Sequence, residues 1–233
     1  MPLLSIVIPV YNERNTIEAT LRQVVGADLP EGISREVIII DDCSTDGTRE
    51  LLGGSGRPFR VFFHERRQGK GAAVRDGIRA SSGDYIVIQD ADQEYDPREY
   101  SSLLGPILAK QADAVYGSRF LAGRPRAGSR FWHYAGNRIL TAFSNAFTHL
   151  QLTDMETCYK MFTRRVADEI SPKLVSDRFE IEPEITARIA KAGFRVLEVG
   201  ISYHGRSYAE GKKIGWKDGL SALWAIVRFN LFP

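Results

Sequence analysis

Cysteine is scarce in this chain: its 233 residues contain two, Cys43 and Cys158. Neither belongs to a C-x-x-C pair, and both stand in stretches crowded with polar residues. This usage argues against a zinc site built from thiolates and against a disulfide framework. A reducing compartment is the simplest interpretation.

Long hydrophobic runs are also missing. No window of the sequence approaches the ~18 to 20 apolar residues that a membrane-spanning helix needs. The opening stretch, "MPLLSIVIPVYNE", is too short for a secretory signal and lacks its positively charged start, so we interpret it as a first strand. If the protein meets a membrane, we expect it to lie on the surface.

A strong charge of one sign is lacking too, since the net charge is +2 at pH 7. With no groove-reading motif either, we expect no nucleic-acid partner. Basic residues do gather locally, at residues 119–130 and 206–217. The 43% hydrophobic and 26% charged residues are otherwise typical of a globular domain.

What the sequence does contain is an alternation of short β-branched runs with helical patterns over its first 120 residues. This order predicts βαβ units and a mostly parallel sheet in one α/β domain. After residue 120 we expect a long helix over about 131–149, a short strand, a helix over 180–193 and a further strand. The strands predicted in the first part are residues 4–10, 35–42, 59–65, 84–90 and 112–120.

Two acidic clusters follow predicted strands. Asp41 and Asp42 end one strand, and Asp90-Ala91-Asp92 follows another. Ligands of parallel sheets bind outside the carboxyl ends of the strands, so both clusters can face one crevice. Asp90 and Asp92 alternate and can present oxygens to one hard cation, such as Mg²⁺ or Mn²⁺ with a bound diphosphate. The alternative is that these acids only form turns and helix caps.

Several motifs together carry a family resemblance: "SIVIPVYNE", "IIIDDCSTDGT", "QGKGAAVRDG" and "IQDADQEYDP", then "VYGSRF", "TDMETCYKMF", "FEIEPEI" and "YHGRSYAEGKKIGWKDG". In this order they resemble inverting glycosyltransferases of family two. The similar branch includes dolichol-phosphate mannose synthase and bacterial polyprenyl-phosphate glycosyltransferases. The resemblance implies a GT-A (Rossmann-like) fold with a central, mostly parallel sheet flanked by helices. Residues 1–120 would form the nucleotide-sugar half and 121–233 the acceptor half of one domain.

The resemblance also implies roles for individual residues. Asp92 and Arg119 would be catalytic, Arg119 and Arg130 would bind the acceptor phosphate, and a basic loop would close over the diphosphate. A solvated surface position is the alternative for each arginine. The metal ligands would be Asp90, Asp92 and Glu94. The nucleotide-binding residues would be Pro9, Tyr11, Glu13, Asp41, Asp42, Lys70, Asp90, Ala91, Arg206 and Lys212, with Asp41 favoured over Asp42.

The implied reaction is metal-dependent transfer of a mannose- or glucose-type sugar, with inversion, from GDP-mannose or a UDP-sugar to a polyprenyl or dolichyl phosphate. A phosphate monoester is already ionised at neutral pH, so this acceptor needs no catalytic base. A sugar-hydroxyl acceptor would need one, and Asp154 or Glu156 would be the first candidates. A nucleotide-binding module without turnover is a third reading.

The C-terminal stretch is amphipathic, with Leu220, Leu223, Trp224, Val227 and Leu231 on one helical face. Such a stripe usually packs in a core. With lysines and Arg228 nearby, the alternative is a helix that docks on anionic lipid. We therefore expect a cytoplasmic protein that is peripheral on the cytoplasmic face of the membrane, by itself or through a membrane-anchoring partner.

Overall fold

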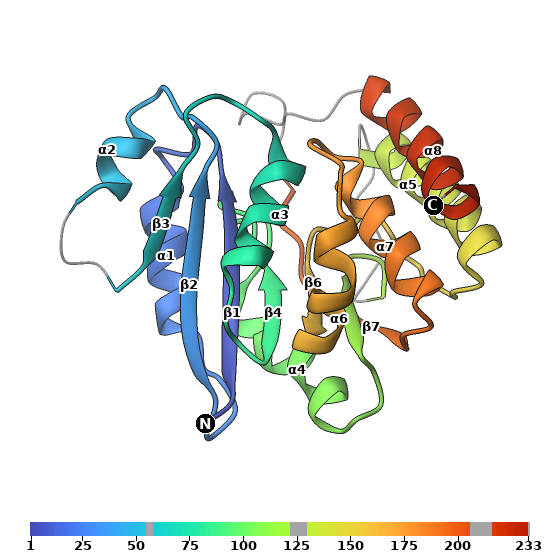
Figure 1. Ribbon diagram of the computed structural model, residues 1–233, viewed down its shortest axis with the longest axis horizontal. Helices are drawn as coiled ribbons and strands as arrows, with labels where there is room; N and C mark the ends of the chain where they lie inside the picture. The colour runs from blue at the N-terminus through green and yellow to red at the C-terminus, as the bar shows by residue number, and fades with distance from the viewer. Residues whose placement is uncertain (55–57, 122–129, 206–215, 233) are drawn as a thin grey trace.

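A seven-stranded sheet organises the molecule (Figure 1). The computed structural model describes residues 1–54, 58–121, 130–205 and 216–232, without the side chains of residues 130–133 and 216–218. The strands lie in the order β3-β2-β1-β4-β6-β5-β7. Their bounds are β1 Leu3–Val10, β2 Ser34–Asp41, β3 Arg60–Phe63, β4 Tyr85–Ile88, β5 Ala114–Ser118, β6 Lys160–Thr163 and β7 Val196–Gly200.

The sheet is mostly parallel, as predicted, but mixed. β1 pairs in parallel with β2 and β4, β2 with β3, and β5 with β7. β6 is antiparallel to both β4 and β5 and joins the early strands to the later ones. One sheet therefore runs through both predicted halves of the domain, and the assignment of separate roles to those halves stays a prediction.

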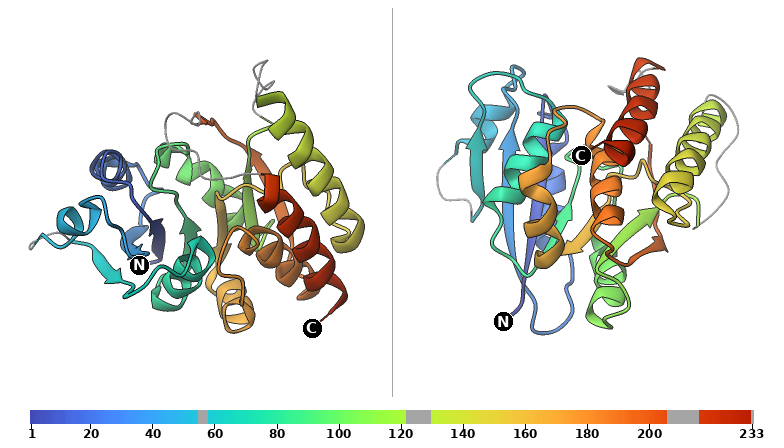
Figure 2. Two further views of the ribbon diagram at one scale, coloured as in Figure 1. Left: turned by 90° about the horizontal axis from the view of Figure 1, so that it is seen from above. Right: turned by 45° about the vertical axis from the view of Figure 1, so that its right-hand side comes forward.

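Helices cover both faces of the sheet (Figure 2). Alternate residues of β1 separate two cores: Ile6 and Ile8 belong to the core under α1 and α4, whereas Val7 belongs to the core under α3, α6 and α7. The helices are α1 Ile17–Gly26, α2 Thr48–Leu52, α3 Lys70–Ala80, α4 Tyr100–Leu108, α5 Arg130–Thr148, α6 Arg164–Ile170, α7 Ile181–Lys191 and α8 Trp216–Leu231, with short 3-10 turns at Pro97–Glu99 and Ser171–Lys173.

α5 and α8 lie side by side beyond α7 (Figures 1 and 2). The face that α8 buries is Ala222, Ala225, Ile226 and Phe229. The stripe predicted from sequence as a packing face lies on the other side, where Trp224 is 62% exposed. Core packing of that stripe is therefore wrong, because small residues on the opposite side of α8 allow close contact with α7. None of the helices within the described ranges has both the length and the apolar character needed to cross a membrane.

Candidate active site

A pocket opens at the carboxyl ends of β1 and β4, where the chain order of the strands reverses. Such a switch point is where ligands bind in open α/β sheets. β1 and β2 end level with each other, since Val10 pairs with Asp41, which brings the segments after both strands to this edge. Of the residues predicted to form the site, ten line the pocket: Pro9, Tyr11, Glu13, Asp42, Lys70, Asp90, Ala91, Asp92, Glu94 and Arg119.

The two acids of the first cluster, Asp41 and Asp42, have different environments. Asp42 lines the pocket, and its carboxylate accepts hydrogen bonds from the backbone of Gln68 and Gly69, both at 2.7 Å. Asp41 was favoured from sequence but is completely buried outside the pocket lining, and it accepts a bond from the Ser44 backbone at 3.1 Å. Asp42 therefore fixes the turn that leads into α3 and faces the ligand side.

The glycines of that turn serve packing within the protein. A Cβ on Gly69 would lie 2.3 Å from the carbonyl oxygen of Asp177, and one on Gly71 would lie 2.4 Å from that of Ser176. Gly69 also has a φ of +112°, which favours glycine. The loop before α7 thus closes against the start of α3, and it adds Arg178 and Phe179 to the pocket.

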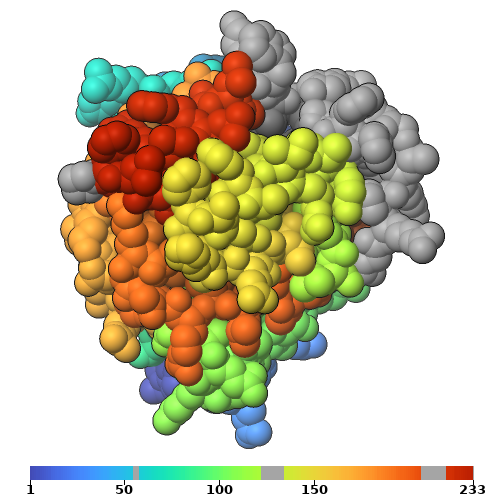
Figure 3. Space-filling model, turned by 90° about the vertical axis from the view of Figure 1, so that its right-hand side faces the viewer, coloured from blue at the N-terminus to red at the C-terminus, as the bar shows by residue number. Residues whose placement is uncertain are grey.

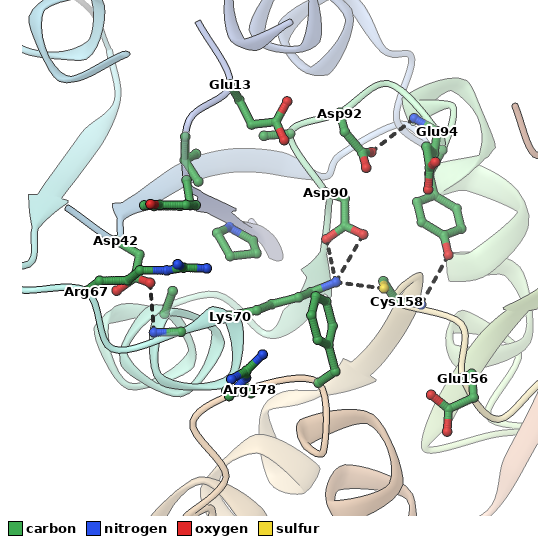
Figure 4. Close-up of a pocket in the computed structure, with 18 of the residues that line it drawn as sticks. Glu13, Asp42, Arg67, Lys70, Asp90, Asp92, Glu94, Glu156, Cys158 and Arg178 are labelled. Carbon is green, nitrogen blue, oxygen red and sulfur yellow. Dashed lines mark hydrogen bonds and ion pairs between the residues drawn. The ribbon is translucent and has the colours of Figure 1, made fainter. Parts of the chain in front are cut away.

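Lys70 stands in the middle of the pocket, at the first turn of α3 (Figure 4). Its Nζ lies 2.8 Å and 3.0 Å from the two carboxylate oxygens of Asp90 and 2.7 Å from the Sγ of Cys158. Burial alone lowers the pKa of the Lys70 ammonium, but Asp90 and the other anionic groups outweigh it and hold that pKa well above its usual value. Lys70 is therefore a fixed positive charge.

The predicted metal ligands are not assembled into one cluster. Asp90 is paired with Lys70, the side chain of Asp92 accepts a bond from the Glu94 backbone at 3.2 Å, and the Glu94 carboxylate accepts one from the Tyr203 hydroxyl at 2.8 Å. No group of three or more acidic, histidine or cysteine side chains in the described part of the chain is placed to hold a metal ion. Lys70 and Tyr203 pair with two of the three predicted ligands, Asp90 and Glu94, and the assignment of a metal to these carboxylates stays a prediction.

Arg119 lines the pocket and is oriented by a buried acid. Its Nε and Nη2 both donate to the Asp154 carboxylate at 2.6 Å, and Asp154 is completely buried. Burial alone raises the pKa of Asp154, but the Arg119 guanidinium outweighs it and holds that pKa below its usual value. Asn137, on α5, donates to the same carboxylate at 2.9 Å. Asp154 therefore positions Arg119. Because both carboxylate oxygens of Asp154 accept hydrogen bonds from Arg119, Asp154 is poorly suited to take a proton from a substrate.

Glu156, the other candidate base, has a different environment. It lines the pocket, and its buried Oε1 accepts no hydrogen bond from the described residues. Burial raises the pKa of Glu156 to about 7, against a lowering by Lys160. At neutral pH this carboxyl is therefore divided between its protonated and ionised forms.

A buried ion pair behind the pocket was not predicted. Lys160 and Glu182 are almost completely buried, and their Nζ and Oε2 lie 2.6 Å apart. The other oxygen of Glu182 lies 3.7 Å from the Nζ of Lys70, so charges alternate from Asp90 through Lys70 and Glu182 to Lys160. The acids of "FEIEPEI" were the available signal, since a helix with acids on its buried side needs cationic partners.

Some predicted residues lie outside the described part of the chain. Arg206 and Lys212 fall in residues 206–215, and Arg130 begins α5 without a described side chain. The guanidinium carbon of Arg67, another residue that lines the pocket, lies 4.1 Å from the centre of the Tyr11 ring.

Residues 5–171 match the family described as glycosyl transferase family 2. The chain belongs to this family. Glycosyltransferase AglJ of Haloferax volcanii is 36% identical to this chain over 204 residues, which are 86% of this chain and 63% of that protein. Dodecaprenyl-phosphate galacturonate synthase of Rhizobium johnstonii is 24% identical over 213 residues, 90% of this chain and 61% of that protein. This chain thus spans less than two thirds of the length of either relative.

Solved structures show the same fold. A crystal structure of glucosyl-3-phosphoglycerate synthase from Mycobacterium tuberculosis, in complex with Mn²⁺, uridine diphosphate and phosphoglyceric acid, superposes with a TM-score of 0.74 at 21% identity. The match covers 100% of this chain and 80% of that one. The predictions of a family 2 glycosyltransferase and of a GT-A fold are therefore confirmed.

Proposed function

We propose that this chain transfers a hexose from a nucleoside diphosphate sugar to a polyprenyl phosphate, with inversion at the anomeric carbon. The observation that carries the proposal is the pocket at the switch point between β1 and β4, which combines carboxylates with the cations Lys70 and Arg119. A diphosphate with a divalent cation needs both kinds of group.

The donor end of the pocket would lie beside β1 and α3. Pro9 lies at the end of β1, Tyr11 and Glu13 follow it, and Asp42 holds the turn that leads into α3. The solved relative bound to uridine diphosphate supports a UDP-sugar as donor. Arg67 stacks on the Tyr11 ring, and together they offer a flat, cationic surface on which a nucleotide base can stack. GDP-mannose is the competing donor.

Asp90 and Asp92 fit a divalent cation in part. Both carboxylates line the pocket, and Mg²⁺ or Mn²⁺ in proteins commonly takes one or two carboxylates and completes its shell with water and substrate phosphates. When bound, the metal would neutralise the charge that develops on the departing nucleoside diphosphate. Lys70 must then exchange Asp90 for the diphosphate or for Glu182, whose Oε1 lies 3.7 Å away.

The acceptor end would lie beside Arg119 and Tyr203. The Arg119 guanidinium is 5.2 Å from the Tyr203 ring centre and is held by Asp154, so the orientation of the guanidinium is fixed. A phosphate monoester bound there brings its own ionised nucleophile, which attacks the anomeric carbon opposite the leaving diphosphate. The relative that makes a dodecaprenyl-phosphate sugar supports this acceptor class.

Glu156 favours a second candidate, transfer to a sugar hydroxyl. A carboxyl with a pKa of about 7 that lines the pocket is suited to accept a proton at neutral pH. Asp154 is a poor base by comparison because it is locked to Arg119. Asp154→Asn would disturb Arg119 under either reading, so Glu156→Gln is the variant that separates them.

The test is sugar transfer to a short polyprenyl phosphate and to simple sugars, with GDP-mannose, UDP-glucose and UDP-N-acetylglucosamine, in Mn²⁺ and in chelator. We expect metal-dependent product on the lipid phosphate, with Glu156→Gln within about tenfold of the unchanged protein because no base is required. Product only on a hydroxyl, with turnover abolished by Glu156→Gln, would replace the first proposal by the second. Nucleotide binding without any product would favour the non-catalytic module.

A further inference from the structure

The outer side of α5 and α8 carries large apolar side chains that no other part of the described protein covers. We call this surface the α5–α8 face; Figure 3 views it directly, with α5 in yellow and α8 in red. Its members are more than half exposed: Ile139 66%, Leu220 58%, Trp224 62%, Leu231 59% and Phe232 54%.

This concentration is specific to the two helices. Apart from Met1, the large apolar side chains elsewhere in the described ranges that exceed half exposure are Leu121 and Val175, which are isolated. Single exposed apolar residues are normal on a protein surface, but several gathered on two adjacent helices indicate a binding surface. α8 also buries a separate inner side, so its outer apolar residues are not needed to pack the domain.

The charged residues in the sequences of α5 and α8 are mostly basic. The sequence of α5 contains no acidic residue, and that of α8 contains one, Asp218. Arg138 on α5 and Arg228 on α8 are both exposed. A helix with an apolar outer side and a cationic margin is the type that lies in the headgroup region of an anionic bilayer, with tryptophan at the interface.

The inner side of α5 connects this face to the pocket. Asn137 lies one residue before Arg138 and donates to Asp154, the acid that orients Arg119. The same helix therefore contributes its outer side to the α5–α8 face and its inner side to the proposed acceptor end of the pocket. A bilayer on the outer side would bring lipid headgroups close to that end.

We infer that the α5–α8 face docks on the surface of a membrane that contains anionic lipid. The inference rests on the proposed function for its biological purpose, delivery of a lipid phosphate, but its physical basis is independent of catalysis. A second copy of the chain is disfavoured as the occupant, because a two-fold contact would bring the arginines of one copy near those of the other.

The test compares binding of the whole chain to vesicles of phosphatidylcholine with and without phosphatidylglycerol. The variant Ile139→Ser/Trp224→Ser/Leu231→Ser removes the centre of the face, and Val25→Ser/Leu108→Ser/Val175→Ser changes three exposed apolar residues elsewhere as a matched control. We expect the first variant to lose about tenfold or more of its binding to anionic vesicles, and the control to bind normally. Added salt should weaken the binding of the unchanged protein.

A second measurement reports directly on Trp224. In a Trp132→Phe/Trp216→Phe protein, Trp224 is the remaining tryptophan, and brominated acyl chains in the vesicles should quench its fluorescence. Equal vesicle binding by the face variant and the control, or no quenching of Trp224, would overturn the inference. A dimer of the unchanged protein that ignores vesicles and is dispersed by the face variant would assign the face to a second copy.

The two proposals fail separately. Transfer to a water-soluble, short-chain polyprenyl phosphate should be unaffected in the face variant, since none of its residues lines the pocket. Vesicle binding through the face without sugar transfer from any donor would refute the proposed function and leave the docking surface standing. Sugar transfer without vesicle binding would refute the docking surface and leave the proposed function standing.

Discussion

At the scale of single residues, the acid clusters could be predicted and their partners could not. A strand that ends in Asp90-Ala91-Asp92 identifies the edge of the sheet where a ligand binds. Nothing local to that stretch indicates Lys70, which pairs with Asp90. Nor does it indicate Cys158 and Glu182, which contact Lys70 from two other segments. The ion pairs that set the charge of a site depend on tertiary contacts, and short sequence motifs do not reveal such contacts.

Lys70→Met tests the pairing with Asp90. Removing the ammonium takes away the cation that contacts both oxygens of Asp90, so we expect affinity for Mn²⁺ without nucleotide to rise by about tenfold. Calorimetric titration of metal into the protein measures it, and Lys173→Met, which changes an exposed lysine, is the matched control. An unchanged or lower metal affinity in Lys70→Met would show that Lys70 does not compete for Asp90.

Glu156→Gln should change how stability depends on pH. The pKa of Glu156 is raised from an ordinary 4.5 to about 7 in the folded protein, so folding favours the protonated form. That stabilisation is complete below the unfolded pKa and is lost as the pH rises through the folded one. Denaturant unfolding should therefore show Glu156→Gln about 1 to 3 kcal/mol more stable than the unchanged protein at pH 8 and little different at pH 4. An equal difference at both pH values would contradict the assignment.

At the scale of elements, hydrophobic alternation was sufficient to place the early strands and the long helices. It could not show that β6 enters between β4 and β5 in the antiparallel direction, because strand order depends on pairing between distant segments. Periodicity also identified the amphipathic character of α8 but not which side is buried. Ala225 and Phe229 pack against Ala187 of α7, whereas Trp224 stays outside.

The contact between the start of α3 and the loop before α7 is open to a direct test. Gly71→Ala places a Cβ against the backbone of Ser176 and Arg178, which cannot move like a flexible side chain. We expect a loss of about 1 to 3 kcal/mol in the free energy of unfolding. Gly105→Ala is the control, since a Cβ there has no neighbour within 4 Å and should stabilise α4 by up to about 1 kcal/mol. Equal stability of the two variants would refute the packing role of Gly71.

At the scale of the whole molecule, the sheet carries the donor residues and the acceptor residues on one rigid frame. β1 and β4 supply the strand ends at the switch point, and β5 supports Arg119 from the other side of β6. The fold, the family and half of the pocket lining followed from the order of motifs along the chain. The partners of the predicted metal ligands did not, because Lys70 and Tyr203 come from distant segments of the chain.

The most direct measurement of the central claim is calorimetric titration of uridine diphosphate, and of guanosine diphosphate in parallel, with Mn²⁺ and with chelator. We expect binding of one nucleotide that requires Mn²⁺ and that Asp92→Asn weakens by about tenfold or more. Asp168→Asn, a change of an exposed acid on α6, should have no effect. Binding of equal strength in chelator, or an Asp92→Asn protein that binds like the unchanged one, would contradict a metal-assisted diphosphate site at the switch point.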